Sequence, residues 1–150
     1  MERKNYIIKW MHQLEKDKLE WQKIISLLLL VVILLIPAIH KITDQIPANW
    51  FINKFNDSLI GKVPGGISIS YFFIILLEFA GPLFFSIGLF QMARKKKSKP
   101  FIDFGFLNCY ILFLTLTFGS FLVMDYDNGF KDFLYFIGVL VIEGRYFSKD

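Results

Sequence analysis

A long apolar stretch, residues 70–91, limits the fold of this chain more than any other part of its sequence. It is long enough for a helix that crosses a bilayer, because a span needs about 20 predominantly apolar residues. One carboxylate, Glu78, lies well inside the stretch. A charge at that depth is costly unless it is protonated, paired or turned toward a wet cavity. Any fold of this chain therefore has to give Glu78 a suitable environment.

Small and aromatic residues share the helix face that carries Glu78. Residues on this face recur at spacings of three and four: Glu78, Gly81, Phe85, Gly88 and Met92. Glycines on such a face allow a neighbouring helix to approach closely, which is how membrane helices pack. We therefore expect this face to point into the interior of a helix bundle.

Composition and charge place the chain among integral membrane proteins. Hydrophobic residues make up 55% of the sequence, and the 18 phenylalanines fall into blocks. The net charge of +4 does not indicate nucleic-acid binding, because the basic residues flank the apolar blocks, where the positive-inside rule puts them. The single cysteine, Cys109, cannot form an internal disulfide, and no Cys/His spacing predicts a metal site. No catalytic residue can be named from these patterns.

The apolar blocks predict an all-α protein, an up-down four-helix bundle embedded in the membrane. The expected spans are residues 24–42, 70–92, 104–124 and 130–147. The fourth is the weakest, because charged residues trim its apolar centre to residues 133–142. The connection over residues 43–69 is aromatic but too short to span, and we expect a short interfacial helix or a lid over the bundle mouth.

The first 23 residues form a charged arm with a periodic apolar stripe. The stripe includes Ile7, Met11, Leu14 and Trp21, opposite a face rich in Lys and Glu. This predicts an amphipathic N-terminal helix, either lying on the membrane surface or extending the first span into the cytoplasm. No cleavable signal peptide is expected, because the charged region is long and no small-x-small site follows the apolar run.

The distribution of Lys and Arg predicts the orientation. Thirteen of these residues lie in the arm, in residues 94–99 and near the C-terminus, and four lie in the remaining connections. This asymmetry predicts that both termini are cytoplasmic in a multi-pass protein of the cell inner membrane.

Five residues in the outer half of the predicted bundle form a candidate binding site. His40 and Lys41 end the first span, and Glu78 lies about 12 Å into the second from the same side. Ser120 and Tyr135 lie at comparable depth in the third and fourth spans. These side chains can form an outward-facing polar pocket for a small or amphipathic ligand. The alternative is a purely structural ion pair between Glu78 and Lys41 or His40.

Two segments resemble the DoxX family of small four-span bacterial membrane proteins. The first span ends Pro37-Ala-Ile-His-Lys41-Ile, which is similar to the Gly-x-x-Lys-like end in that family, with the glycine replaced. The second span carries Leu77-Glu78-Phe-Ala-Gly81 and then Gly88-Leu89, similar to the family's Glu followed by small residues and Gly-Leu. The arginine that often opens the first span is absent, and Lys23 is the nearest substitute.

Two functions of different classes stay open, and the resemblance implies the first of them. The first is a redox-associated membrane subunit that binds a quinone or similar lipid-like molecule near Glu78 and works with a partner protein. No intrinsic cofactor motif is visible, so the partner would hold the redox group. The second is a non-catalytic scaffold subunit, or a protein that handles a small solute or lipid.

Overall fold

The computed structural model describes residues 2–147, with the side chains of residues 14, 15 and 17–147. All regular secondary structure in this range is helical, so the described chain is all-α, as predicted. Four helices are long and two are short: α1 (Glu2–Thr43), α2 (Asn49–Phe55), α3 (Leu59–Lys62), α4 (Gly66–Ala93), α5 (Lys99–Leu122) and α6 (Tyr126–Tyr146).

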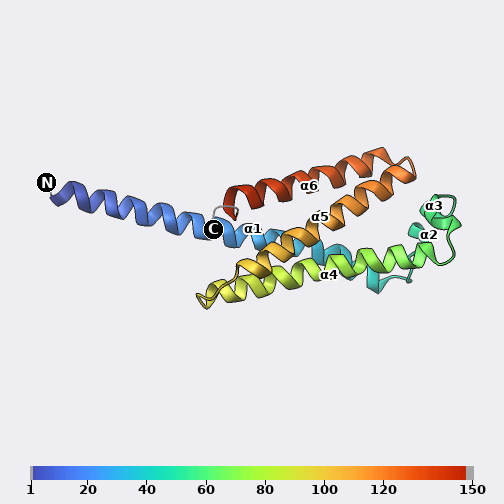
Figure 1. Cartoon of the computed structure of the whole chain (residues 1–150), viewed down its shortest axis with the longest axis horizontal. Coiled ribbons are helices and arrows are strands. Elements are labelled where there is room, and N and C mark those ends of the chain that lie inside the picture. Colours follow the sequence, from blue (N-terminus) through green and yellow to red (C-terminus); the bar gives the residue numbers. More distant parts are fainter. Residues whose placement is uncertain (1, 148–150) are drawn as a thin grey trace.

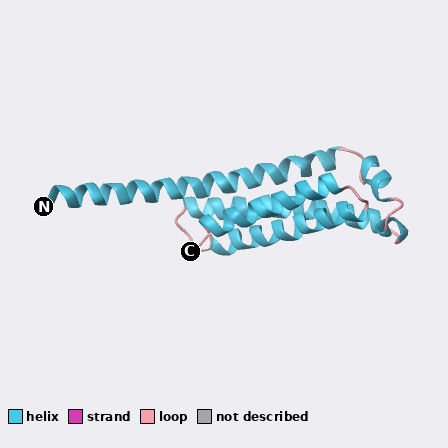
Figure 2. Cartoon of the chain, turned by 90° about the horizontal axis from the view of Figure 1, so that it is seen from above, coloured by secondary structure: helices cyan, strands magenta, loops and turns pink. Residues whose placement is uncertain are grey.

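The long helices lie side by side, and successive ones run in opposite directions (Figure 1). Helix α4 packs closely against both α1 and α5, and α5 packs against α6. Helices α1 and α6 contact each other at few points. The two short helices lie at the end of the assembly where α1 ends and α4 begins (Figure 2).

Three helical segments are long and apolar enough to cross a membrane: Asp17–Thr43, Gly66–Ala93 and Lys99–Leu122. They indicate a multi-pass membrane protein that lies in a lipid bilayer. Helix α6 is not among them, because Lys131 and Asp132 near its start and Glu143 and Arg145 near its end interrupt its hydrophobicity.

The arm and the first predicted span form one helix, because α1 continues without a break from Glu2 to Thr43. Its first half projects beyond the other helices in line with the second half (Figure 1). The side chains of residues 1–13 lie outside the described part, so the predicted apolar stripe of the arm stays a prediction there. Of the two alternatives for the arm, the backbone matches an extension of the first span.

Two of the long helices begin four residues before the predicted spans. Helix α4 begins at Gly66, after Gly65 adopts the left-handed conformation with φ of 74°, which suits a glycine in a tight turn. Helix α6 begins at Tyr126, because the side chain of Asp125 caps it by accepting a hydrogen bond from Asn128 N. The cluster at residues 125–129, which looks like a turn in the sequence, is the first turn of this helix.

The connection between α1 and α4 contains two short helices in place of the single one expected. Helix α2 ends at Phe55, and Ser58 then caps α3. Phe51 and Phe55 are buried, whereas Leu59, on the same face by spacing, is 68% exposed. Because the chain leaves the helix after Phe55, the buried apolar face of α2 does not continue to Leu59.

The face of α4 that carries Glu78 points into the interior, as predicted. Glu78, Gly81, Phe85 and Gly88 are buried, and Met92 is partly buried. Helix α5 approaches this face closely enough for Asn108 Nδ2 to donate a hydrogen bond of 2.8 Å to the carbonyl of Leu77. Such interhelical hydrogen bonds help membrane helices to associate.

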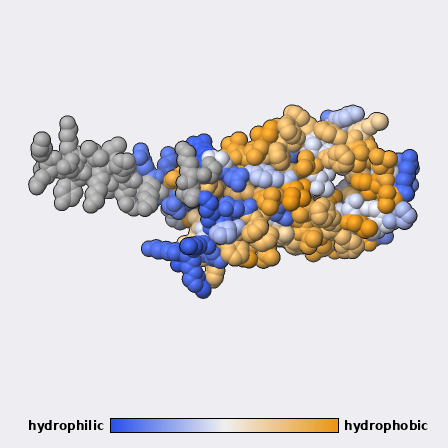
Figure 3. Space-filling view, in the orientation of Figure 1, coloured by the Kyte–Doolittle hydropathy of each residue, from blue (hydrophilic) through white to orange (hydrophobic). Residues whose placement is uncertain are grey.

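The outer surface of the long helices is apolar. Figure 3 shows hydrophobic side chains over the middle of the molecule and hydrophilic ones toward its two ends. Exposed residues such as Leu76, Leu83, Leu114 and Phe118 are more than half accessible. An exposed apolar surface of this extent is typical of a protein surrounded by lipid.

Candidate ligand-binding site

An ion pair between α1 and α4 forms the base of the site. Lys41 Nζ lies 2.5 Å from Glu78 Oε1, and the two side chains are 15% and 5% exposed. The hydroxyl of Tyr71, about two helix turns before Glu78 on α4, donates a hydrogen bond of 3.2 Å to the carbonyl of Lys41. These two contacts hold the last turn of α1 against α4.

The second oxygen of Glu78 has no hydrogen-bond partner among the described residues. This atom, Oε2, is buried. Leaving a buried polar atom unpaired costs about 1–3 kcal/mol, more for a charged group. Such an exception in an otherwise well-packed interior marks a place where a ligand can supply the missing donor.

Glu78 and Lys41 line a cavity of about 360 Å³ that five helices enclose. This volume lies at the lower end of the roughly 300–1,000 Å³ typical of small-molecule sites. The apolar lining comes from α1, α2, α4 and α5: Ile33, Leu34, Pro37, Trp50, Phe51, Phe55, Ile74, Leu112, Phe113, Leu116 and Gly119. The other lining residues are polar or aromatic with a hydroxyl: Lys41, Lys54, Glu78, Thr115, Ser120, Asn128, Asp132 and Tyr135.

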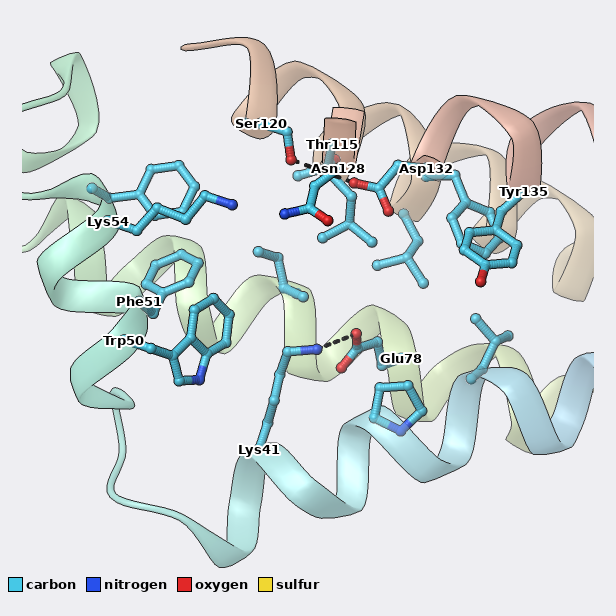
Figure 4. Close-up of a pocket in the computed structure, with 18 of the residues that line it drawn as sticks. Lys41, Trp50, Phe51, Lys54, Glu78, Thr115, Ser120, Asn128, Asp132 and Tyr135 are labelled. Carbon is cyan, nitrogen blue, oxygen red and sulfur yellow. Dashed lines mark hydrogen bonds and ion pairs between the residues drawn. The ribbon is translucent and has the colours of Figure 1, made fainter. Parts of the chain in front are cut away.

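A second polar group lies across the cavity from the ion pair (Figure 4). Ser120 Oγ on α5 donates a hydrogen bond of 3.4 Å to Asp132 Oδ2 on α6. Lys54 on α2 lines the same side and pairs with Asp125 at the start of α6. This second group therefore joins three helices at one end of the cavity.

The charge of Asp125 depends on its contacts at the edge of the site. Hydrogen bonds from Lys54, and then from the side chain and backbone of Asn128, lower the pKa of Asp125 from 3.8 to about 2. Asp125 is thus ionised at any pH at which the protein would work.

Aromatic side chains form the wall of the cavity on the α2 side. Phe51 packs edge-on against Tyr71, with ring centroids 5.0 Å apart. Trp50 is half exposed and also lines the cavity. On the opposite side, the ring of Tyr135 stacks on Phe113 at 5.7 Å. The cavity thus offers flat apolar surfaces between polar groups.

Four of the five predicted site residues meet in this cavity. Glu78, Lys41, Ser120 and Tyr135 all line it. His40 does not: it is exposed and borders a separate depression beside Asp44 and Trp50. His40 therefore lies outside the cavity, because consecutive helical residues point about 100° apart and Lys41 is the one that faces α4.

Sequence reasoning missed four polar residues of the cavity: Lys54, Thr115, Asn128 and Asp132. In the sequence, Asp132 counts only among the charges that trim the apolar centre of α6, although it directly precedes that centre. The reasoning that identified Glu78, that a carboxylate in an apolar segment needs a suitable environment, applies at the edge of such a segment to Asp132 as well. Lys54 gave no such signal, because its role depends on how α2 folds over the cavity.

Other parts of the chain offer weaker sites. Among the described residues, no group of three or more His, Cys, Asp or Glu side chains could hold a metal ion. A shallow groove near the 94–99 loop is lined by Lys96, Lys97 and Lys99 above Phe104 and Leu107. It matches the surface that a basic loop presents to anionic lipid headgroups, and it carries no buried polar group.

Comparison with known proteins does not add to this picture. No protein-family model matches the chain, and comparisons with curated proteins and with solved structures give no match either.

Proposed function

We propose that this chain is a DoxX-like, four-span protein of the cell inner membrane that binds a quinone or a similar lipid-soluble molecule in the cavity beside Glu78. The observation that carries the proposal is the unpartnered, buried Oε2 of Glu78 in a cavity of suitable size. A hydroxyl on the ligand would donate to this oxygen, and the ammonium of Lys41 would donate to a carbonyl. The aromatic wall would hold the ring or the start of the tail.

The proposal includes α6 as the fourth span. Its charged residues lie near the two ends, whereas residues 133–142 are without charge. Helix α6 packs along α5, and one of its end charges, Glu143, accepts a hydrogen bond from Tyr110 on α5. Four antiparallel spans then form an up-down bundle, with both termini in the cytoplasm and the cavity in the outer half.

The position of the cavity favours a ligand dissolved in the membrane. Pro37 on α1 and Tyr135 on α6 line the cavity and are exposed, so it reaches the surface at these side chains. Pro37 lies six residues before the end of α1 and Tyr135 nine residues after the start of α6. At 1.5 Å per residue these positions are roughly 9 and 14 Å below the helix ends, within the proposed membrane region.

A redox role for this chain would require a partner. The proposed subunit binds and positions the quinone, and a partner protein that carries a redox cofactor exchanges electrons with it. The second function class, a scaffold or a protein that handles lipids or small solutes, predicts instead that the Lys41–Glu78 pair only joins α1 to α4.

The test is equilibrium binding of a decyl-substituted 1,4-hydroquinone, kept reduced, to the purified protein in mild detergent. Trp50 lines the cavity, and the chain has three tryptophans. A Trp10→Phe, Trp21→Phe background therefore leaves Trp50 as the reporter of ligand in the cavity. Glu78→Gln keeps the side-chain volume, and we expect it to weaken binding at least about tenfold, because a hydrogen bond to a charged group contributes about 1.5–3 kcal/mol.

Glu78→Leu should weaken binding at least as much, while the matched control Glu143→Gln should leave it unchanged. Glu143 is a carboxylate at the other end of the long helices, and it does not line the cavity. Saturable binding that survives both Glu78 substitutions would contradict the proposed function and favour a structural ion pair. Thermal unfolding of each variant shows whether the protein is still folded.

A further inference from the structure

The polar side chains of the cavity divide into two groups on opposite walls. The first group is Lys41 with Glu78, supplied by α1 and α4. The second is Lys54 with Ser120 and Asp132, supplied by α2, α5 and α6. Figure 4 shows the two groups facing each other across the cavity. Apolar side chains, including Ile74, Leu112 and Leu116, line the space with them.

Each group contains both donors and acceptors. Lys41 has hydrogens beyond the one that it gives to Glu78, and Glu78 Oε2 is an unpartnered acceptor. In the second group, Lys54 has donors beyond the one given to Asp125, and a carboxylate such as Asp132 can accept several hydrogen bonds. Each wall can therefore bind either a hydroxyl or a carbonyl oxygen.

The formal charges on the lining balance. Two lysines and two carboxylates line the cavity. A charged ligand would be buried in the cavity without a net countercharge on the lining residues, which is costly. The lining thus suits a neutral ligand with a polar atom at each of two opposite ends and an apolar middle.

We infer that the cavity binds its ligand at both ends, with Asp132 and Ser120 as specificity-determining residues opposite Glu78. This inference rests on the proposed function and narrows its ligand class. The ligand is a neutral ring compound with oxygen atoms at two opposite ring positions, such as a 1,4-hydroquinone or 1,4-quinone. A lipid with a single polar end, such as an alkylphenol, satisfies only one wall.

The experiment compares two probes in the Trp50-only background described above. One is decyl-1,4-hydroquinone, kept reduced, and the other is 4-decylphenol, which lacks the second hydroxyl. The readout is the ratio of the two Kd values. We expect the hydroquinone to bind about tenfold more tightly or better, because one additional hydrogen bond to a charged group is worth about that factor.

Substitution of Asp132 should remove this preference. Asp132→Leu leaves only the Glu78 wall, so both probes bind there and the ratio should fall to about one. Asp132→Asn should give an intermediate ratio, because a neutral hydrogen bond is roughly half as strong as one to a carboxylate. Ser120→Ala should lower the ratio as well, since Ser120 contacts Asp132. A merely structural role of Asp132 would change both Kd values together and leave their ratio intact.

The matched control is Asp127→Asn, in the first turn of the same helix and outside the cavity. It should leave both Kd values unchanged. If both probes bind equally well to the parent protein, the two-ended inference is wrong while the proposed function stands. If the ratio stays near ten in Asp132→Leu and Ser120→Ala, the inference is also wrong. If neither probe binds the parent, the proposed function itself fails.

Discussion

Single glycines determine how closely α4 and α5 approach. Gly105 on α5 lies directly over the ring of Phe85 on α4, which is fully buried. A Cβ at position 105 would lie 2.4 Å from Phe85 Cε1 and 2.6 Å from Cδ1. Gly81 has a similar role on α4, where a Cβ would lie 2.7 Å from Leu34 Cδ1 on α1. The two glycines allow α4 to lie close to both α1 and α5. This close packing places Glu78 beside the cavity.

Gly105→Ala should destabilise the protein by about 1–3 kcal/mol, the usual cost of an extra carbon atom in a tightly packed interior. The ring of Phe85 has no free space into which it can turn, since Phe106 packs against it at 5.3 Å between ring centroids. The measurement is unfolding in detergent. The control is Gly138→Ala on α6, where a Cβ would meet nothing within 4 Å. Equal stability of the two variants would contradict the close-approach argument.

At the scale of elements, α2 closes one side of the cavity and two kinds of contact hold it there. Phe51 and Phe55 are buried against the helix assembly, and Lys54 pairs with Asp125 at the cap of α6. The apolar contacts are not sensitive to pH. The ion pair between Lys54 and Asp125 is sensitive to pH, because the pKa of Asp125 is lower in the folded protein than its ordinary value. The attachment of α2 therefore has one acid-sensitive component.

The direction of this pH effect follows from the lowered pKa of Asp125. Its contribution to stability is present above the ordinary pKa of 3.8, and it is lost as the pH falls toward the folded pKa of about 2. In the Trp50-only background, the emission of Trp50 should change between pH 4 and 2, within the window that these two pKa values define.

Asp125→Asn should abolish this transition, because asparagine can still cap the helix but carries no charge. Asp127→Asn should retain the transition, since Asp127 is in the first turn of α6 but does not pair with Lys54. An unchanged acid transition in Asp125→Asn would show that another group controls the position of α2.

At the scale of the whole molecule, the outer surface and the charge distribution are consistent with one placement in a bilayer. The apolar middle in Figure 3 is flanked by hydrophilic side chains at both ends. The basic 94–99 loop lies at the end toward which the arm projects, and the short helices lie at the other (Figure 1). In the proposed orientation, which follows the positive-inside rule, the loop and the arm lie in the cytoplasm.

Reporter fusions test this placement together with the fourth span. A fluorescent protein fused after Asp150 should fluoresce, and alkaline phosphatase at the same position should be inactive, because four spans return the chain to the cytoplasm. A fusion that truncates the chain after Met124, before α6, should give the reverse result. An external reporter after Asp150 would show that α6 does not cross the membrane.

The sequence by itself determined the helical class and the apolar segments, and it singled out Glu78 as a carboxylate inside one of them. Helix formation and membrane crossing depend on local runs of apolar residues, which are directly visible in residues 70–91. The inward face of α4 also followed from spacing alone, because residues three and four apart lie on one side of a helix. Lys41 was a candidate because it ends α1 on the side where α4 begins.

The tertiary structure decided which polar side chains share one cavity. It chose Lys41 over His40, because only one of two consecutive helical residues can face α4. It brought Lys54 and Asp132 to the cavity from segments 78 residues apart, through the folding of α2 over the helix ends and the packing of α6 on α5. Such pairings depend on the rotation and offset of packed helices. A periodic pattern within one helix contains no information about either quantity.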